Sequence, residues 1–336
     1  MTASAGNTQR ASRSQLLNYI LRRALEGVPI LLCILILNFL LIHAAPGDPA
    51  TYLAGQMQGT EEFQQQLKRE FGLDRPLYEQ LAVYLGKVLR GDLGYSFRYR
   101  QDVMGLVLSR VGNTLLLMGS GFVVATLAGI LLGAIASQRA YSYGDHLATF
   151  LALAGYSMPV FWLGQLLLIT LSLGLGWFPA QGMASLRVRA TGMDALLDRL
   201  HHLVLPATTY AIYHLTLVFR LTRGKMQEIL KEDYIITARA KGLDERTVVY
   251  KHGLRNALLP VVTVLGINFG FMLAGSVLVE TVFAWPGMGR LMYEGILSRD
   301  YPVLMGVFTI VSVMVIIANI VTDVVYSFID PRVVYK

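Results

Sequence analysis

The chain has 336 residues, of which 54% are hydrophobic and only 15% are charged. Because soluble domains carry about 25% charged residues, this composition excludes an ordinary soluble globular protein. The single cysteine, Cys33, excludes an intrachain disulfide, and the formal net charge of +7 lies in segments between apolar runs, which favours a membrane topology over nucleic-acid binding.

Apolar segments without charged residues recur along the whole chain. The apolar core of a bilayer is about 30 Å thick, so a crossing helix needs about 20 such residues. Six stretches reach that length: Gly27–Gly47, Val111–Gln138, His146–Leu186, Leu200–Phe219, Asn256–Val279 and Tyr301–Thr322. The sequence therefore predicts an all-α polytopic membrane protein with six transmembrane helices, the third crossing once near Leu147–Leu173.

The first apolar segment also resembles a signal peptide, because four arginines precede it. Its 21 residues exceed the usual apolar core of a signal peptide, and His43-Ala44-Ala45 is a poor cleavage site. Both features favour an uncleaved transmembrane helix.

The distribution of lysine and arginine predicts the orientation. With both ends in the cytoplasm, the inner segments 1–26, 139–145, 220–255 and 323–336 hold 16 of these residues, and the outer segments 48–110, 187–199 and 280–300 hold 13. Eight of the 13 lie in the first outer loop, which is long enough to escape the positive-inside rule. The remaining excess on the inner side predicts cytoplasmic N- and C-termini.

These boundaries divide the chain into five parts. They are a cytoplasmic N-terminal segment (1–26), a first transmembrane helix (27–47), an outer loop (48–110), a core of five transmembrane helices (111–329) and a cytoplasmic tail (330–336). Apolar residues at helical spacing form two runs in the outer loop: Phe63, Leu67 and Phe71, then Leu77, Leu81, Tyr84 and Leu85. The sequence therefore predicts a small helical domain on the outer face.

The inner loop contains a short helix with its own start and stop signals. We expect Asp233 to cap its N-terminus, Lys241 to lie in its last turn and Gly242 to end it in the left-handed conformation. Asp244 would cap a second helix through Val248 and Val249. Small residues at 237, 238 and 240 leave a thin surface for a partner protein, and the alternative is an amphipathic helix at the membrane interface.

The same segment resembles the coupling motif of the dipeptide/oligopeptide/nickel-type ABC importer permeases. It reads Thr-Ala-Arg-Ala-Lys-Gly-Leu over Thr237–Leu243, with Leu254–Pro260 following. The general motif begins Glu-Ala-Ala, and of the residues at those positions only Ala238 matches. Further stretches resemble the family in the same order: Ala45–Pro49, Phe71–Pro76, Gly91–Ser96, Ser157–Gly164, Glu280–Gly289, Arg299–Pro302 and Asp330–Arg332. The long outer loop is typical of the first of two paralogous permeases.

This resemblance implies a type I ABC importer permease fold, a bacterial inner-membrane location and transport of peptides or similar small solutes. The implied partners are a second permease, two cytoplasmic ATPases that bind ATP and Mg²⁺, and an extracytoplasmic solute-binding protein, while this chain binds no cofactor. The residues implied in ATPase coupling are Asp233, Tyr234, Thr237, Ala238, Arg239, Ala240, Lys241, Gly242 and Leu243. Glu61, Lys68 and Arg98 are predicted to dock the binding protein.

Two groups of residues are candidates for the translocation pathway. Met158, Pro159 and Trp162 form a proline-broken aromatic stretch in the third apolar segment, where packing is the alternative role. Asn319 and Asp323 share one face near the inner end of the last segment. An acid within a membrane segment is a functional candidate, although a position this close to the interface also stays hydrated.

Other functional classes lack their required residues. No phosphate-binding loop G-x-x-x-x-G-K-[ST] exists, since Gly224-Lys225 is followed by Met226, so the chain is not expected to hydrolyse ATP. No H-E-x-x-H motif supports a zinc protease, and the histidines do not form a metal site. The alternative of an ion-coupled secondary transporter expects paired mid-membrane acids and inverted repeats, which the sequence does not contain.

Overall fold

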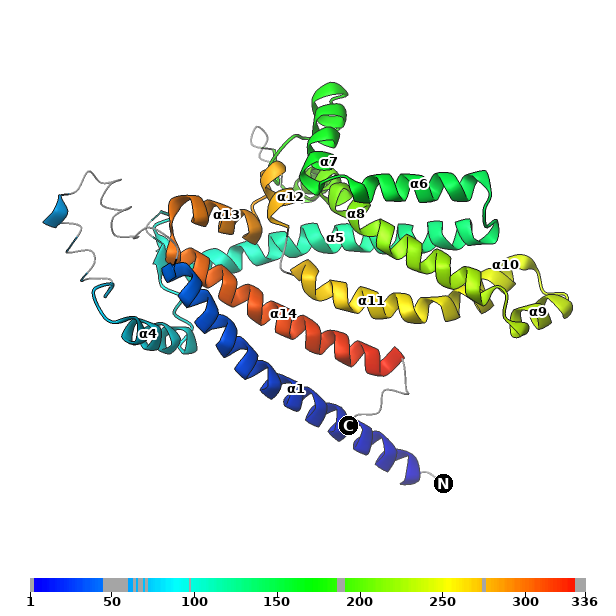
Figure 1. Cartoon of the computed structure of the whole chain (residues 1–336), viewed down its shortest axis with the longest axis horizontal. Helices are drawn as coiled ribbons and strands as arrows, with labels where there is room; N and C mark the ends of the chain where they lie inside the picture. Colours follow the sequence, from blue (N-terminus) through cyan, green and yellow to red (C-terminus); the bar gives the residue numbers. More distant parts are fainter. Residues whose placement is uncertain are drawn as a thin grey trace. The chain divides into compact units, whose positions relative to one another are not determined.

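The computed structural model describes residues 3–44, 60–62, 65, 69, 72–96, 98–185, 191–273 and 276–329. Side-chain surroundings are defined between residues 19 and 324 of these ranges, except at 267, 270, 271 and 273. The chain divides into two compact units, one of Met1–Asn113 with Gly287–Ile317 and one of Thr114–Pro286 with Ala318–Lys336. Figure 1 shows that both are built almost entirely from helices.

The first unit contains α1 (Ala3–Ala44), α4 (Leu77–Leu89), the beginning of α5 (Val103–Gln138), α13 (Met288–Ser298) and most of α14 (Tyr301–Ile329). Two short antiparallel strands, β1 (Tyr95–Ser96) and β2 (Gln101–Asp102), form a hairpin before α5. Its core joins the loop, α5, α13 and α14 through Leu93, Val103, Leu106, Val107, Met288, Leu291, Val303 and Val307. The second predicted run of the outer loop is therefore a helix, α4, while the first run lies mostly outside the described residues.

Polar contacts attach α4 to both long helices of the first unit. The Tyr84 hydroxyl lies 3.1 Å from Thr309 Oγ1 on α14, and His43 Nε2 of α1 lies 3.2 Å from Gln80 Oε1. Burial raises the pKa of Tyr84 above its ordinary value. The described part of the outer loop is thus anchored to α1 and α14 through α4.

The second unit contains the rest of α5, α6 (Tyr143–Ser157), α7 (Val160–Leu167), the π-helix η1 (Leu168–Gly174) and α8 (Met193–Ile229). It continues with α9 (Asp233–Ala240), α10 (Glu245–Thr247), the π-helix η2 (Val248–Leu254), α11 (Arg255–Leu273) and α12 (Val277–Val282). The central element is α8, which packs against α6, α7, α11 and α12. Figure 1 shows α5, α8 and α11 running alongside one another.

Glycines on α5 allow it to approach α8 closely. A Cβ atom on Gly121, Gly129 or Gly133 would lie 2.7 to 2.8 Å from the nearest atom of Tyr210, Val218 or Thr222, respectively. Such distances leave no room for a side chain, so the two backbones meet at these positions. Small residues serve the same purpose in membrane helix pairs generally.

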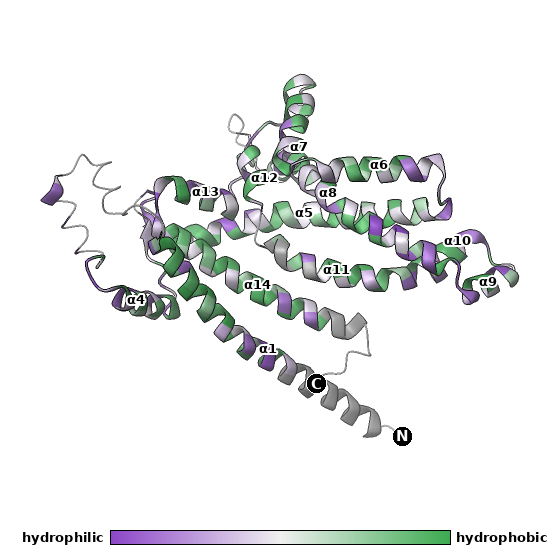
Figure 2. Ribbon diagram, in the orientation of Figure 1, coloured by the Kyte–Doolittle hydropathy of each residue, from purple (hydrophilic) through white to green (hydrophobic). Residues whose placement is uncertain are grey.

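Each of the six apolar segments predicted from the sequence contains a described helix, although residues 175–185 of the third segment are not helical. Four described helices are long and apolar enough to span a membrane: Tyr19–Ala44, Val103–Gln138, Met193–Ile229 and Tyr301–Val324. A bent pair of helices adds a fifth span if the two together cross the membrane once. In Figure 2 much of the green that marks hydrophobic residues lies on α1, α5 and α14, whereas α8 also carries hydrophilic residues. The remaining predicted span coincides with α11, after which residues 274 and 275 lie outside the described ranges.

The third predicted span is not one continuous helix. The pair Tyr143–Ser157 and Val160–Gly174 is bent by 106° at Met158 and Pro159. Proline has a fixed φ and no amide proton, and it forces the preceding residue into an extended conformation, which Met158 adopts with ψ 135°. The segment is therefore a broken span or a re-entrant turn.

Candidate coupling surface and transmembrane pocket

The inner-loop helix α9 ends in a complete Schellman motif. Gly242 adopts φ +78°, its amide donates to the Arg239 carbonyl at 2.9 Å, and the Leu243 amide donates to the Ala238 carbonyl at 3.4 Å. Only glycine takes this left-handed conformation without steric cost. The predicted stop signal at Gly242 is confirmed, and Lys241 occupies the C-cap position.

The start of α9 differs from the prediction. Glu232 is the N-cap residue, with φ −70° and ψ 147°, and no side chain caps the helix. Asp233 is instead the first helical residue, where its negative charge still lies near the positive end of the helix dipole. The prediction placed the cap one residue too late because both acidic residues are suitable at that position.

One face of α9 packs against η2. Ile235 and Ala238 are buried with Val248, and Ile229 and Leu230 at the end of α8 complete this cluster. Ala238 is only 6% exposed, so the expectation that it belongs to the thin outer surface is wrong. Helical geometry places residues 235 and 238 on the same face, which here is the inner one.

The remaining surface of α9 and of the turn after it is exposed and includes large apolar side chains. Ile236 is 55% exposed, Tyr234 42% and Leu243 40%, and Thr237, Ala240 and Lys241 are exposed as well. We call these six residues the exposed face of α9. It combines small and apolar side chains and is therefore suited to close contact with another protein.

Hydrogen bonds fix the geometry of this loop. Arg239 binds Glu245 through two contacts of 3.1 and 2.7 Å, across the turn at Gly242. This interaction lowers the pKa of Glu245 below its ordinary value. The Asp244 carboxylate accepts from the Thr247 amide at 3.0 Å, which confirms Asp244 as the cap of the second helix, and its pKa is lowered by hydrogen bonds with Thr247.

Buried side chains and a hydrogen bond join this loop to the long helices α8 and α11. Met226 of α8, Val249 of η2 and Ala257 of α11 form one buried cluster. Asn256 Nδ2 also donates to the Tyr234 hydroxyl at 2.9 Å, which joins α11 to α9. Packed side chains and one hydrogen bond therefore connect α9 to α8 and α11.

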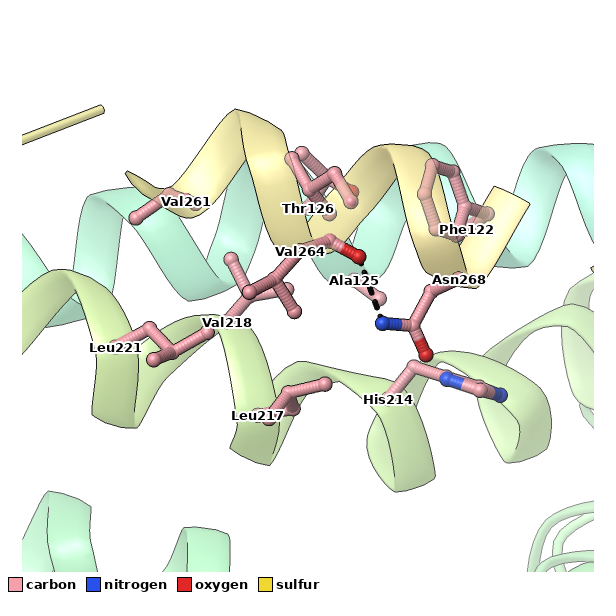
Figure 3. Close-up of a pocket in the computed structure, with 11 residues that line it drawn as sticks. Phe122, Ala125, Thr126, His214, Leu217, Val218, Leu221, Val261, Val264 and Asn268 are labelled. Carbon is pink, nitrogen blue, oxygen red and sulfur yellow. Dashed lines mark hydrogen bonds between the residues drawn. The ribbon is translucent and has the colours of Figure 1, made fainter. Parts of the chain in front are cut away.

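A pocket lies among α5, α8 and α11 of the same unit (Figure 3). Eight of its eleven lining residues are apolar, and the three polar ones are Thr126 of α5, His214 of α8 and Asn268 of α11. Its interior volume is about 10 Å³, which corresponds to roughly one water molecule. Sequence analysis missed these residues because single polar side chains within apolar segments give no motif.

The residues predicted for the translocation pathway do not line this pocket. Met158 and Pro159 form the break between α6 and α7, and Trp162 is 43% exposed on α7. Asn319 is exposed and Asp323 half-buried near the end of α14. The roles of both groups in the pathway stay predictions.

Of the residues predicted to dock a binding protein, Glu61 and Arg98 are exposed, whereas Lys68 lies outside the described residues. Next to Arg98 is a buried polar network that the sequence analysis did not identify. The Ser96 hydroxyl donates to Asp300 at 2.5 Å, and the Tyr99 hydroxyl donates to Glu294 at 2.5 Å. Burial, together with the contact to Glu294, raises the pKa of Tyr99 to about 12. The network attaches the hairpin to α13 and α14.

Residues 129–335 match the family described as "Binding-protein-dependent transport system inner membrane component", and residues 16–118 match its N-terminal counterpart. The chain belongs to this family. The permease is 41% identical over 318 residues to the oligopeptide transport system permease protein AppB of Bacillus subtilis, covering 94% of this chain and 99% of that protein. It is 38% identical over 338 residues to the dipeptide transport system permease protein DppB of Escherichia coli K12, covering 96% of this chain and 100% of DppB.

Another relative is the glutathione transport system permease protein GsiC of Escherichia coli O6:H1. GsiC is 39% identical over 321 residues, and the match covers 96% of this permease and 100% of GsiC. Among solved structures, a chain of the inward-facing MetNI methionine ABC transporter matches with a TM-score of 0.54 and 17% identity, over 68% of this chain and 97% of that chain. The fold predicted from the sequence, that of a type I ABC importer permease, is confirmed.

Proposed function

We propose that this permease is a transmembrane subunit of an ABC importer that moves di- or oligopeptides, or a similarly small solute, across the bacterial inner membrane. The observation that carries the proposal is the 38 to 41% identity over nearly the whole chain to permeases named for oligopeptide, dipeptide and glutathione transport. These solutes share the peptide amide and differ in length and side chains. The common chemistry supports a peptide as the transported molecule.

Coupling to ATP hydrolysis occurs through the exposed face of α9. This face lies in the segment 220–255, which holds 9 lysine and arginine residues and is cytoplasmic in the proposed orientation, with both termini inside. It docks in a groove on one of two separate ATPase subunits, which bind the ATP and Mg²⁺. Dimerisation of the ATPases moves α9. Because buried clusters of side chains connect α9 to η2, α8 and α11, these helices move with it.

The proposed complex also contains a second, paralogous permease and an extracytoplasmic binding protein. The outer loop offers exposed charged residues at Glu61 and at Arg98, which lies between the two strands of the hairpin. Together with Lys68, these residues contact the binding protein. Crosslinks from all three positions should therefore form with the binding protein rather than with the transported solute.

The test is uptake of labelled peptides into proteoliposomes that contain the permease pair, the ATPases and the binding protein. We expect uptake to need ATP and the binding protein and to persist when ionophores remove ion gradients. Uptake that is driven by an ion gradient without ATP would instead identify a secondary transporter. The permease purified without ATPases should show no ATP hydrolysis.

A further inference from the structure

The pocket among α5, α8 and α11 has one hydrogen-bonding side chain from each helix. Thr126 projects from α5, His214 from α8 and Asn268 from α11, and the rest of the lining is apolar (Figure 3). Polar side chains within membrane-spanning helices are costly to bury and are functional candidates for that reason. Three of them converging on one pocket call for an explanation beyond helix packing.

Each of these groups retains unused hydrogen-bonding capacity. Thr126 Oγ1 is buried and has no hydrogen-bond partner among the described residues. Asn268 donates its amide to the Val264 carbonyl at 2.8 Å, and its carboxamide oxygen points toward the side of His214 without a partner in the described part of the chain (Figure 3). His214 contacts the rings of Tyr210 and Tyr213, at 4.3 and 5.3 Å between centroids, and its imidazole makes no hydrogen bond to a described residue.

The set of donors and acceptors defines the chemistry of a suitable ligand. No lining residue is a carboxylate, a lysine or an arginine, so a charged group would be buried without a counter-ion. The hydroxyl donates to a carbonyl, the carboxamide oxygen accepts from an N–H, and the imidazole serves either purpose. A neutral group with both a donor and an acceptor satisfies this arrangement, and the peptide amide is such a group.

We propose that this pocket is a contact site for backbone amides of the solute during its passage through the membrane. The inference rests on the proposed peptide import and names the residues that recognise the common part of every peptide. The volume of about 10 Å³ admits one water-sized group in this conformation. Amide entry therefore requires α8 or α11 to shift, and the buried clusters described above connect both helices to α9.

The chain offers a matched control for the test. Thr149 of α6 also has a buried hydroxyl without a hydrogen-bond partner among the described residues, but it does not line the pocket. Thr126→Val and Thr149→Val therefore both replace a hydroxyl by a methyl group of similar shape. Thr126 lines the pocket and Thr149 does not. Thr126→Ser keeps the hydroxyl, and Asn268→Leu removes the carboxamide from α11.

The experiment measures uptake by the complete reconstituted importer with two probes, trialanine and its analogue in which one backbone amide is replaced by an ester. The wild type should transport trialanine faster than the ester analogue. Thr126→Val and Asn268→Leu should lower the maximal rate for trialanine by about 2- to 10-fold, in keeping with the loss of one hydrogen bond. In Asn268→Leu the preference for the amide should disappear, while Thr126→Ser and Thr149→Val should behave like wild type.

The ratio of the two probes is measured within each variant, so it does not depend on expression or stability. An unchanged ratio in Asn268→Leu together with wild-type rates in Thr126→Val would overturn the amide site. An equal loss of rate in Thr149→Val would also overturn it, because the effect would then be one of packing. Absence of uptake by the wild type of trialanine and of all other labelled peptides, with ATPases and binding protein present, would instead contradict the proposed peptide import itself.

Discussion

Asp145 at the start of α6 and Arg223 near the end of α8 form a bidentate ion pair across 78 residues of sequence. Arg223 Nε lies 2.5 Å from Asp145 Oδ1 and Nη2 lies 2.7 Å from Oδ2, and the Asp145 side chain is fully buried. Asp145 also accepts from the Tyr141 amide at 2.8 Å, so it holds the connection between α5 and α6 against α8. Two parallel charge-assisted hydrogen bonds define the relative rotation of these helices.

Replacing one member of this pair should destabilise the permease. Asp145→Ala leaves the Arg223 guanidinium partly buried without its partner, and we expect a loss of about 2–3 kcal/mol in the free energy of unfolding. The double variant Asp145→Ala with Arg223→Met should recover part of this loss, because it removes the unpaired charge. Unfolding in denaturing detergent measures the stability of the wild type, of Asp145→Ala and of the double variant. Equal stabilities of Asp145→Ala and the wild type would contradict the prediction.

The glycines of α5 should differ in their tolerance of alanine. Gly129→Ala places a methyl group 2.7 Å from Val218 Cβ, and overpacking of this kind costs about 1–3 kcal/mol. Gly119 lies on the same helix, but a Cβ at that position would have no neighbouring atom within 4 Å, so Gly119→Ala should be neutral or slightly stabilising. The thermal stability of the two variants in detergent tests this prediction. A similar loss of stability in Gly129→Ala and Gly119→Ala would show that close packing of α5 against α8 does not cause the loss.

Gly242 should couple ATP use to transport. No atom lies within 4 Å of a Cβ at this position, so a substitution acts through backbone strain alone. Gly242→Val at φ +78° adds about 1–3 kcal/mol of strain, which leaves the long helices folded but displaces the exposed face of α9. We expect normal insertion with reduced ATPase association or uncoupled hydrolysis.

Gly242→Asn is the matched control, because asparagine tolerates the left-handed conformation better than valine. Lys241→Gln should impair coupling less than Gly242→Val, because it keeps the backbone conformation and a long polar side chain at the exposed position. Ala238→Trp should impair coupling by disrupting the cluster with Ile235 and Val248. The measurements are the amount of copurified ATPase and peptide uptake. Normal values for Gly242→Val and Ala238→Trp would remove α9 from the coupling mechanism.

The attachment of the outer hairpin should depend on pH through Asp300. Burial raises the pKa of Asp300, although hydrogen bonds from Ser96 and the Val303 amide oppose this shift. The folded protein therefore binds a proton more tightly than the unfolded chain, so this stabilisation is present at low pH and is lost as the pH rises from about 4 through the raised pKa.

The thermal stability of wild type and Asp300→Asn should consequently diverge with pH in that window. Asp300→Asn cannot titrate at this position, so the wild type should lose stability relative to it as the pH rises from about 4 through the raised pKa. Asp74→Asn, at an exposed site before α4, is the control and should follow the wild type. If the thermal stabilities of wild type and Asp300→Asn changed with pH in parallel, Asp300 would not control the attachment of the outer hairpin.

The sequence by itself determined the features that depend on local interactions. Uncharged runs of membrane length identified the helical segments, since burying charge in lipid is costly wherever the run occurs. Gly242 and Asp244 predicted the turn between α9 and α10, because a left-handed glycine and an N-cap act within a few residues. The motif around them also indicated the family, which the matches over nearly the whole chain confirm.

Only the tertiary structure decided which side chains meet. The helical pattern of α9 did not reveal that Ala238 faces inward, because burial depends on η2, which follows in the chain and folds back against it. Neither the Asp145–Arg223 pair nor the convergence of Thr126, His214 and Asn268 leaves a local pattern, since the partners come from separate helices. The closeness of α5 to α8, which the glycines of α5 permit, is likewise a property of two packed surfaces rather than of either segment alone.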